Sequence, residues 1–398
     1  MNNLHIILYS SFPKYSGGRE NWLINILPGI SGAFNQIFIY VYKSDRETFY
    51  DLSPFTNVVL KEVSGLRKKD LLFYILNFIS FKLLFLWDSL IIFRKQVRML
   101  LQQELKPGDT VLATNSIIEM QPAVDIVSKI NNVRLVCIAH GLAPIELGNY
   151  IPYYRSKFQL MEKRLLPLCD AVLANGYDTQ AYLRDVGVNS IVIPNGVNVG
   201  YFQKDNPQLN SDVDLASLLE LKNRGVRIIL MVATLRKIKG IEYLLEAGKL
   251  IKDKGLSNFR IVFVGKGDQL IYKNKAFALG IQNRVLFLGE KKNIPSYLHS
   301  ADVVVCLSGG GGMSLSALEA MAAGKPIVAW DTPVYQQLIM NMQEGYLVKY
   351  PDLDELAEGI NFVLENPETA AMFAANAQQK VNQYDWPNVS TKLLEKLV

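Results

Sequence analysis

The chain has 398 residues, of which 49% are hydrophobic and 20% charged, and its formal net charge is +5. This balance is typical of a folded globular protein and excludes a disordered chain. The length is sufficient for two domains with cores of their own. The positive charge is small and spread along the chain, so we do not expect a nucleic-acid partner.

Cysteine usage indicates the compartment. Cys137, Cys169 and Cys306 lie far apart among apolar residues, and no CxxC pair occurs. We interpret them as buried free thiols in a reducing environment. The first residues run directly into an apolar strand, without the basic start and small-residue cleavage site of a secretory signal. We therefore expect a cytoplasmic protein.

The first half of the chain predicts a parallel sheet. Short apolar strands are expected at 4–9, 37–42, 58–62, 110–114, 133–139 and 171–174, with helical patterns between several of them. Such a sheet binds ligands beyond the carboxyl ends of its strands. Gly17 and Gly18 follow the first strand, and His140 follows the strand at 133–139. The glycine pair is not a G-x-G-x-x-G motif, so it does not indicate a dinucleotide site.

One apolar segment, 71–93, has nearly the length of about 20 residues that spans a bilayer. It is interrupted by Asn77, Lys82 and Asp88 and flanked by basic residues at both ends. A span would place Lys82 near the membrane centre, which costs at least about 2.5 kcal/mol. A buried helix pair, an interfacial amphipathic helix and a true span remain open. The interfacial reading predicts peripheral membrane contact through residues 71–98.

The second half repeats the strand and helix alternation. A turn signal at 194–196 and a polar loop at 206–213 suggest a linker, and strands are expected at 227–233, 259–265, 285–289, 303–306, 327–330 and 346–348. Arg236, Lys237 and Lys239 form a compact cationic cluster after the first of these strands. A solvated charge run is the ordinary interpretation of such a cluster.

The most informative stretch is 301–338, which reads as strand, four glycines, helix and strand. A glycine loop that opens a helix presents free N–H groups and the positive end of the helix dipole, which suit a phosphate. Glu319 lies among apolar residues and needs a partner. Either Ser316 and Glu319 form a capping box, or Ser314 caps the helix and Glu319 points toward a ligand hydroxyl. Any strand–helix unit of an α/β sheet remains the plainer interpretation.

The segment LEAMAAGKPIVAWD resembles the signature of the retaining glycosyltransferases of family 4, which have the GT-B fold. The GG-x-E loop with Gly17 and Gly18, the histidine at His140, the IPNGVN hinge and the Lys239–Gly240 pair are similar to family motifs as well. The resemblance implies two Rossmann-like doubly wound domains with a cleft between them. Residues 1–196 would form the acceptor-side domain, and residues 197–379 would form the nucleotide-sugar domain. The terminal helix at 380–398 would cross back and join the acceptor-side domain.

The resemblance also implies roles for individual residues. His140 would position the transferred sugar, and Lys239 would neutralise the leaving diphosphate. The family's arginine position is Thr234 here, and we expect Arg236 to take its place. Glu319 would hold the ribose hydroxyls, whereas the family's first glutamate falls at Gly311. The expected donor-binding residues are Gly17, Gly18, Gly265, Gly311, Gly312, Met313, Ser314, Leu315 and Glu319.

The implied activity is transfer of a hexose from a UDP- or GDP-type sugar to a hydroxyl of a glycan or lipid-linked acceptor, in cell-surface polysaccharide or glycolipid synthesis. No cofactor and no metal are expected. The D-x-D triplets at 212–214 and 352–354 are interpreted as a solvated loop and a helix cap. The expected location is the cytoplasm or the inner face of the membrane. The alternative is a non-catalytic partner or sugar-binding subunit that lost its chemistry with the first glutamate.

Overall fold

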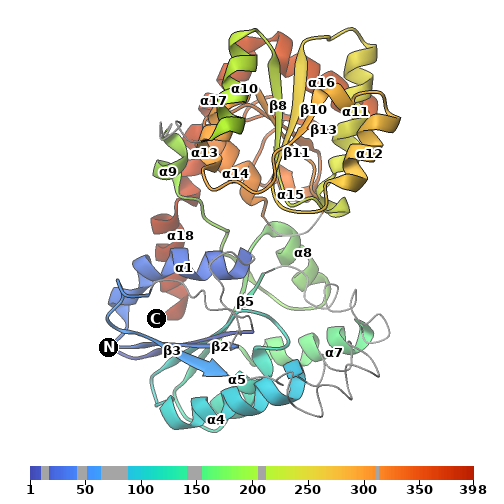
Figure 1. Ribbon diagram of the computed structural model, residues 1–398. Coiled ribbons are helices and arrows are strands. Elements are labelled where there is room, and N and C mark those ends of the chain that lie inside the picture. The colour runs from blue at the N-terminus through green and yellow to red at the C-terminus, as the bar shows by residue number, and fades with distance from the viewer. Residues whose placement is uncertain (10–17, 43–51, 64–87, 141–154, 205–211, 310–312) are drawn as a thin grey trace, which may run out of the picture. The chain divides into compact units, whose positions relative to one another are not determined.

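The computed structural model describes residues 1–9, 18–42, 52–63, 88–140, 155–204, 212–309 and 313–398 (Figure 1). The chain divides into two compact units. The first unit comprises Met1–Asn195 together with Trp386–Val398, and the second comprises Gly196–Asp385. The terminal segment that returns to the first unit thus begins at Trp386, a few residues beyond the expected position 380.

The first unit is built on a seven-stranded parallel sheet with the order β3-β2-β1-β4-β5-β6-β7. Its strands are β1 (Leu4–Leu8), β2 (Ile37–Tyr42), β3 (Val58–Val63), β4 (Thr110–Ala113), β5 (Arg134–Ala139), β6 (Ala171–Ala174) and β7 (Ile191–Val192). Its α-helices are α1 (Gly18–Ile30), α4 (Arg94–Glu104), α5 (Met120–Val127), α7 (Arg155–Leu165), α8 (Tyr177–Asp185) and α18 (Trp386–Leu397). From β1 the chain adds β2 and β3 on one side of the sheet and then β4 to β7 on the other. The order of strands thus reverses between β1 and β4, and such sheets bind ligands at this point.

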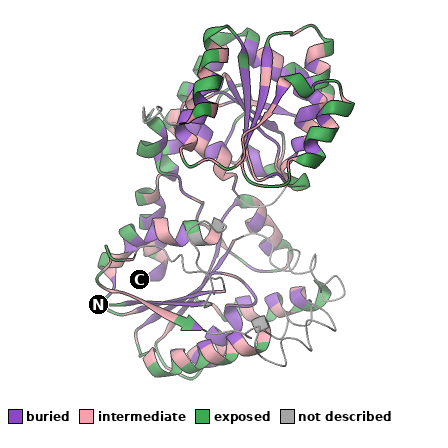
Figure 2. Ribbon diagram, viewed as in Figure 1, coloured by how far each residue is buried: buried purple, intermediate pink, exposed green. Residues whose placement is uncertain are grey.

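The central strands of this sheet are buried on both faces, as Figure 2 shows, whereas the edge strands β3 and β7 are only partly buried. Side chains alternate along a strand, so Leu4, Ile6 and Leu8 of β1 enter one core and Ile7 enters the other. Helices α1 and α18 cover the first of these cores and pack side by side. They approach so closely that a Cβ at Gly29 would lie 2.4 Å from Ser390 Cβ. The apolar strand pattern therefore reflects helices on both faces.

Only part of the segment with the ambiguous apolar pattern is described. Residues 88–98 form a π-helical turn (Asp88–Phe93) and the start of α4, and their Phe93 and Val97 side chains are buried in the core of the first unit. Residues 71–87, which carry most of that prediction, lie outside the described residues. Among the helices that the structure describes, none is both long and apolar enough to cross a membrane.

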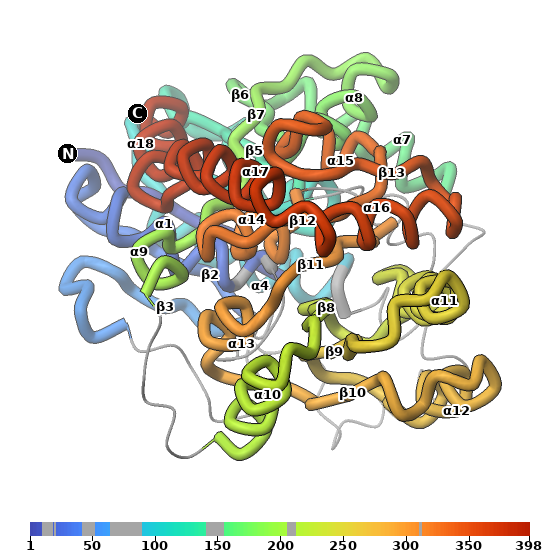
Figure 3. The backbone as a smooth tube through the Cα atoms, turned by 90° about the horizontal axis from the view of Figure 1, so that it is seen from above, coloured from blue at the N-terminus to red at the C-terminus, as the bar shows by residue number. Residues whose placement is uncertain are grey.

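The second unit holds a six-stranded parallel sheet with the order β10-β9-β8-β11-β12-β13. Its strands are β8 (Arg227–Val232), β9 (Phe259–Val264), β10 (Val285–Phe287), β11 (Val303–Cys306), β12 (Ile327–Trp330) and β13 (Tyr346–Val348). Its α-helices are α9 (Val199–Gln203), α10 (Val213–Asn223), α11 (Ile241–Asp253), α12 (Leu270–Ala278), α13 (Ile294–Ser300), α14 (Leu315–Ala322), α15 (Pro333–Gln336), α16 (Leu353–Glu365) and α17 (Pro367–Lys380). The strand order reverses between β8 and β11, and helix α9 packs beside α14 (Figure 3).

Candidate functional site

In the second unit, the strand order reverses between β8 and β11, and hydrogen bonds link the loops that follow these two strands. The loop after β8 contains a short 3-10 helix (Lys237–Lys239), and the Gly309 N–H donates a hydrogen bond of 2.9 Å to the Ile238 carbonyl of that loop. The Lys239 ammonium donates to Ser308 Oγ at 3.3 Å. Gly240 has φ +78°, and a Cβ there would lie 2.6 Å from Leu307. Sequence positions about seventy residues apart therefore form one corner.

This corner carries positive charge without a described counter-ion. Burial, followed by the nearby positive charge of Arg236, lowers the pKa of Lys239. No ion pair involving Lys239 or Arg236 occurs within the described part of the chain. Arg236 is exposed, and its Nε lies 3.4 Å from Thr234 Oγ1. Two cations close to each other, of which Lys239 is partly withdrawn from water, favour an anion between them.

A third loop, after β9, closes onto the same corner. Leu235 N–H donates to the Lys266 carbonyl at 2.8 Å. Gly265 has φ +151°, and a Cβ there would lie 2.0 Å from the Ala233 carbonyl oxygen. Gly265 is therefore fixed as glycine both by its backbone conformation and by the approach of the β8 loop.

Helix α14 begins at this edge, and the structure decides between the two interpretations of its start. Ser314 is the N-cap, and its hydroxyl accepts the Ala317 N–H at 3.3 Å. The alternative capping box with Ser316 is therefore wrong. The Ser308 N–H donates to the hydroxyl of buried Tyr335 at 2.7 Å, which anchors the strand end before the glycine loop. Met313 is buried, whereas Gly311 and Gly312 lie outside the described residues.

Glu319 lies one turn into α14, and its carboxyl group has no hydrogen bond or ion pair from any described residue. Burial raises the pKa of its carboxyl group to about 7. Tyr201 lies on α9, the helix that packs beside α14. Burial, and then the charge of Glu319, raise the pKa of the Tyr201 phenol. A carboxyl group that titrates near neutrality without a protein partner can accept hydrogen bonds from ligand hydroxyls.

In the first unit, His140 follows β5 at the sheet's carboxyl edge. Its ring lies edge-on to Trp22 of α1, with centroids 4.6 Å apart and an interplanar angle of 72°. Burial, followed by the charge of Arg19, lowers the pKa of His140 to about 3, so the imidazole is neutral at physiological pH. Gly18 begins α1, and Gly17 lies outside the described residues.

Sequence reasoning missed several groups at these edges. Arg19 donates from Nη1 to Glu119 Oε1 at 2.8 Å, next to the predicted His140. Glu119 stands in the run SIIEMQPA, so the signal that drew attention to Glu319, a lone carboxylate among apolar residues, was present here too. Ser308 and Tyr335 gave no such signal, because nothing in the local sequence links them to the Lys239 loop.

The two D-x-D triplets cap helices. Asp212 accepts the Asp214 and Leu215 N–H groups as the N-cap of α10, so the prediction of a plain solvated loop is wrong. Asp352 caps α16 as predicted. Among the described residues, no group of three or more His, Cys, Asp or Glu side chains is arranged to hold a metal ion.

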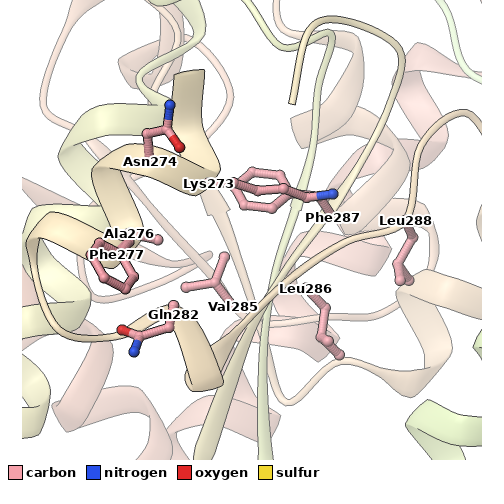
Figure 4. Close-up of a pocket in the computed structure, with 9 residues that line it drawn as sticks. All are labelled: Lys273, Asn274, Ala276, Phe277, Gln282, Val285, Leu286, Phe287 and Leu288. Atoms are coloured by element: carbon pink, nitrogen blue, oxygen red, sulfur yellow. The ribbon is translucent and has the colours of Figure 1, made fainter. Parts of the chain in front are cut away.

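A groove of about 530 Å³ lies elsewhere in the second unit, between α12 and the edge strand β10 (Figure 4). Apolar side chains including Phe277, Val285 and Leu286 line it, with Lys273 and Asn274 among the polar ones. None of the predicted site residues contributes to its walls. The corner at Lys239 and Glu319 is the better candidate site, because it gathers uncompensated charge and unpartnered polar groups.

Solved structures share this architecture over nearly the whole chain. Anabaena Alr3699/HepE in complex with UDP matches with a TM-score of 0.77 at 20% identity, covering 100% of this chain and 99% of that one. Sucrose-phosphate synthase from Thermosynechococcus elongatus matches with a TM-score of 0.76 at 18% identity, covering 99% and 97%. Two Rossmann-like units with parallel sheets and this similarity define a protein of the GT-B fold.

The sequence comparisons give the family. Residues 220–380 match the model for glycosyl transferases group 1, and residues 56–201 match the model for glycosyltransferase family 4. Together these two matches show that the chain belongs to the family 4 glycosyltransferases. Phosphatidyl-myo-inositol mannosyltransferase of Mycolicibacterium smegmatis is 30% identical over 212 residues, 52% of this chain and 52% of that protein. The matched stretch thus spans about half the length of that relative.

Proposed function

We propose that this protein is a retaining glycosyltransferase that moves a hexose from a UDP- or GDP-type sugar to a hydroxyl acceptor, without a metal. The observation that carries the proposal is the joined corner of the second unit. Lys239, bonded to Ser308, supplies positive charge next to a glycine loop and the start of α14. The carboxyl group of Glu319, in that helix, has no partner among the described residues. A diphosphate linked to a ribose has the complementary groups, namely negative charge and vicinal hydroxyls.

The donor class has independent support. Anabaena Alr3699/HepE, which shares the fold, was crystallised with UDP and with UDP-glucose. In this chain the diphosphate would lie against Arg236, Lys239 and the amides around Met313 and Ser314, with the base beside the loop that contains Gly265. The ribose hydroxyls would donate to the Glu319 carboxylate.

The proposed reaction breaks the bond between the sugar's anomeric carbon and the diphosphate oxygen. The acceptor hydroxyl oxygen bonds to that carbon on the face from which the diphosphate departs, and the hydroxyl proton passes to the departing phosphate oxygen. Arg236 and Lys239 stabilise the negative charge that develops on the leaving group, an effect worth several kcal/mol in a preorganised site. His140, being neutral, positions the sugar through a hydrogen bond.

The acceptor we propose is a glycan or a lipid-linked hydroxyl, used in cell-surface polysaccharide or glycolipid synthesis at the inner face of the membrane. The name of the mycobacterial relative indicates a lipid acceptor for that enzyme. Peripheral membrane contact through 71–98 belongs to this proposal, and only residues 88–98 of that stretch are described.

A non-catalytic binding subunit is the second candidate, because Gly311 occupies the position of the family's first glutamate. A thermal-shift screen with UDP, GDP and their hexose conjugates, followed by hydrolysis assays with those that bind, separates the two. Binding with turnover supports the transferase, whereas binding without turnover, in the presence of candidate acceptors as well, supports the subunit. A Glu319→Gln variant should lose the shift by nucleotide, since a bound ligand stabilises only the state that binds it. No shift with any nucleotide would overturn both candidates.

A further inference from the structure

Three buried polar atoms at the carboxyl edge of the first unit lack hydrogen-bond partners among the described residues. They are Trp22 Nε1, Glu119 Oε2 and His140 Nε2. Each unsatisfied buried group costs about 1–3 kcal/mol, so such groups in a native protein require an explanation. The three residues are linked: the Trp22 and His140 rings are in contact, and Arg19 pairs with Glu119 and acts electrostatically on His140.

The Arg19–Glu119 pair has defined geometry. Glu119 Oε1 accepts from Arg19 Nη1 at 2.8 Å and from the Tyr9 backbone N–H at 3.0 Å. The Arg19 Nη2 group lies 3.5 Å from the Tyr9 carbonyl oxygen. The Glu119 side chain is 0% exposed and that of Arg19 is 30% exposed. The guanidinium group is therefore held by Glu119 and the Tyr9 carbonyl, while part of the Arg19 side chain stays exposed.

As a stabilising ion pair, this arrangement is poor. Arg19 stands in the first turn of α1, where the helix dipole disfavours a cation. Burying a carboxylate costs several kcal/mol unless its lone pairs are satisfied, and here only Oε1 has partners among the described residues. The pair is better explained by a ligand that completes it than by stability.

We propose that Glu119 is a positioning residue, which holds the Arg19 guanidinium beside the His140 imidazole so that both present fixed hydrogen-bonding groups to a neutral, hydroxyl-rich ligand. This proposal rests on the proposed function and names the group that binds at this edge. Because Glu119 balances the charge of Arg19, a phosphate group would gain little electrostatic binding energy from Arg19. A sugar's hydroxyl groups can accept from Arg19 and donate to the His140 imidazole.

The kinetic test is a double-mutant cycle on the full chain with the nucleotide-sugar that turns over. Glu119→Gln and Arg19→Met should each lower kcat by about 10²-fold, the size of effect that a misplaced positioning group produces. The donor KM should change little, because the nucleotide is assigned to the second unit. If Glu119 acts through Arg19, the double variant should be no worse than Arg19→Met alone within about twofold. Additive losses, or wild-type kcat in Glu119→Gln, overturn the proposal.

Glu162 provides a matched control. It is also a buried glutamate of the first unit, but it accepts hydrogen bonds from Ser116 Oγ at 2.5 Å and Tyr182 OH at 2.8 Å. Glu162→Gln should leave kcat close to wild type and combine additively with Arg19→Met. Should Glu119→Gln fail to fold, Arg19→Lys answers instead, because it keeps the charge, lacks the planar fork and should lose a comparable factor in kcat.

A second readout does not depend on turnover. The Nε–H resonance of Arg19, assigned by its absence in Arg19→Met, should be sharp in the wild type and in Glu162→Gln. It should be broadened or lost in Glu119→Gln. If the wild type transfers no sugar, the proposed function fails while this resonance still decides whether Glu119 holds Arg19. A resonance that is equally sharp in Glu119→Gln overturns the positioning role.

Discussion

The Lys239 ammonium lies 3.3 Å from Ser308 Oγ, and this contact joins the loop after β8 to the end of β11. The lysine has no acidic partner among the described residues, and burial lowers its pKa. Its position is therefore a cost to the free protein that a bound anion would offset.

Replacing this lysine tests its role in charge stabilisation. Lys239→Met should lower kcat by about 10²–10³-fold, the loss found when one preorganised donor is removed from a developing charge. The stability of the free protein should not fall, because the variant removes a poorly solvated cation. Steady-state kinetics and urea unfolding measure both. Lys237→Met, an exposed lysine of the same 3-10 helix, is the control and should retain its kcat. Equal losses in both variants would contradict the assignment.

Glu319 predicts a pH dependence of stability. Burial raises the pKa of its carboxyl group to about 7 from an ordinary value near 4.5, so the folded state binds the proton more tightly than the unfolded state. The free energy of unfolding should therefore decrease as pH rises from about 4.5 to about 7, by roughly 1–3 kcal/mol from this group. In Glu319→Gln this decrease should be absent, and at pH 8 the variant should be more stable than the wild type. Urea unfolding at pH 5 and pH 8 measures it; identical pH profiles would refute the raised pKa.

Much of the architecture could be predicted from the sequence because local patterns encode it. Runs such as 303–306 and 327–330 are buried parallel strands, and apolar runs with helices between them indicate such strands directly. The placement of His140 after β5 follows from the same logic. The Arg19–Glu119 pair could not be predicted, because its partners are 100 residues apart and only the fold brings them together. Ser308 next to Lys239 is a second case, 69 residues apart.

The close packing of α1 on α18 gives a stability prediction. A Cβ at Gly29 would lie 2.4 Å from Ser390 Cβ, closer than two carbon atoms pack. Gly29→Ala must push the terminal helix outward, and overpacking of this kind costs about 1–3 kcal/mol. Thermal and urea unfolding should show the loss. Gly32→Ala is the control, since a Cβ there meets no heavy atom within 4 Å. A Gly29→Ala variant as stable as Gly32→Ala would mean that α18 does not pack as described.

Two glycine variants distinguish the effect of backbone strain from the effect of steric overlap in the loop after β9. Gly265→Ala brings a side chain into a left-handed region at φ +151° and places its Cβ 2.0 Å from the Ala233 carbonyl oxygen. Gly255 has φ +102°, and a Cβ there would meet no heavy atom within 4 Å, so Gly255→Ala carries the backbone strain alone. We expect Gly255→Ala to lose about 1–2 kcal/mol of stability and to keep nucleotide binding. Gly265→Ala should lose more stability and weaken nucleotide binding at least about tenfold, because the Lys239 corner must shift to make room. Isothermal titration with UDP or GDP, paired with urea unfolding, measures both quantities. Equal stability and equal affinity in the two variants would show that the β9 loop does not abut the β8 loop at this edge.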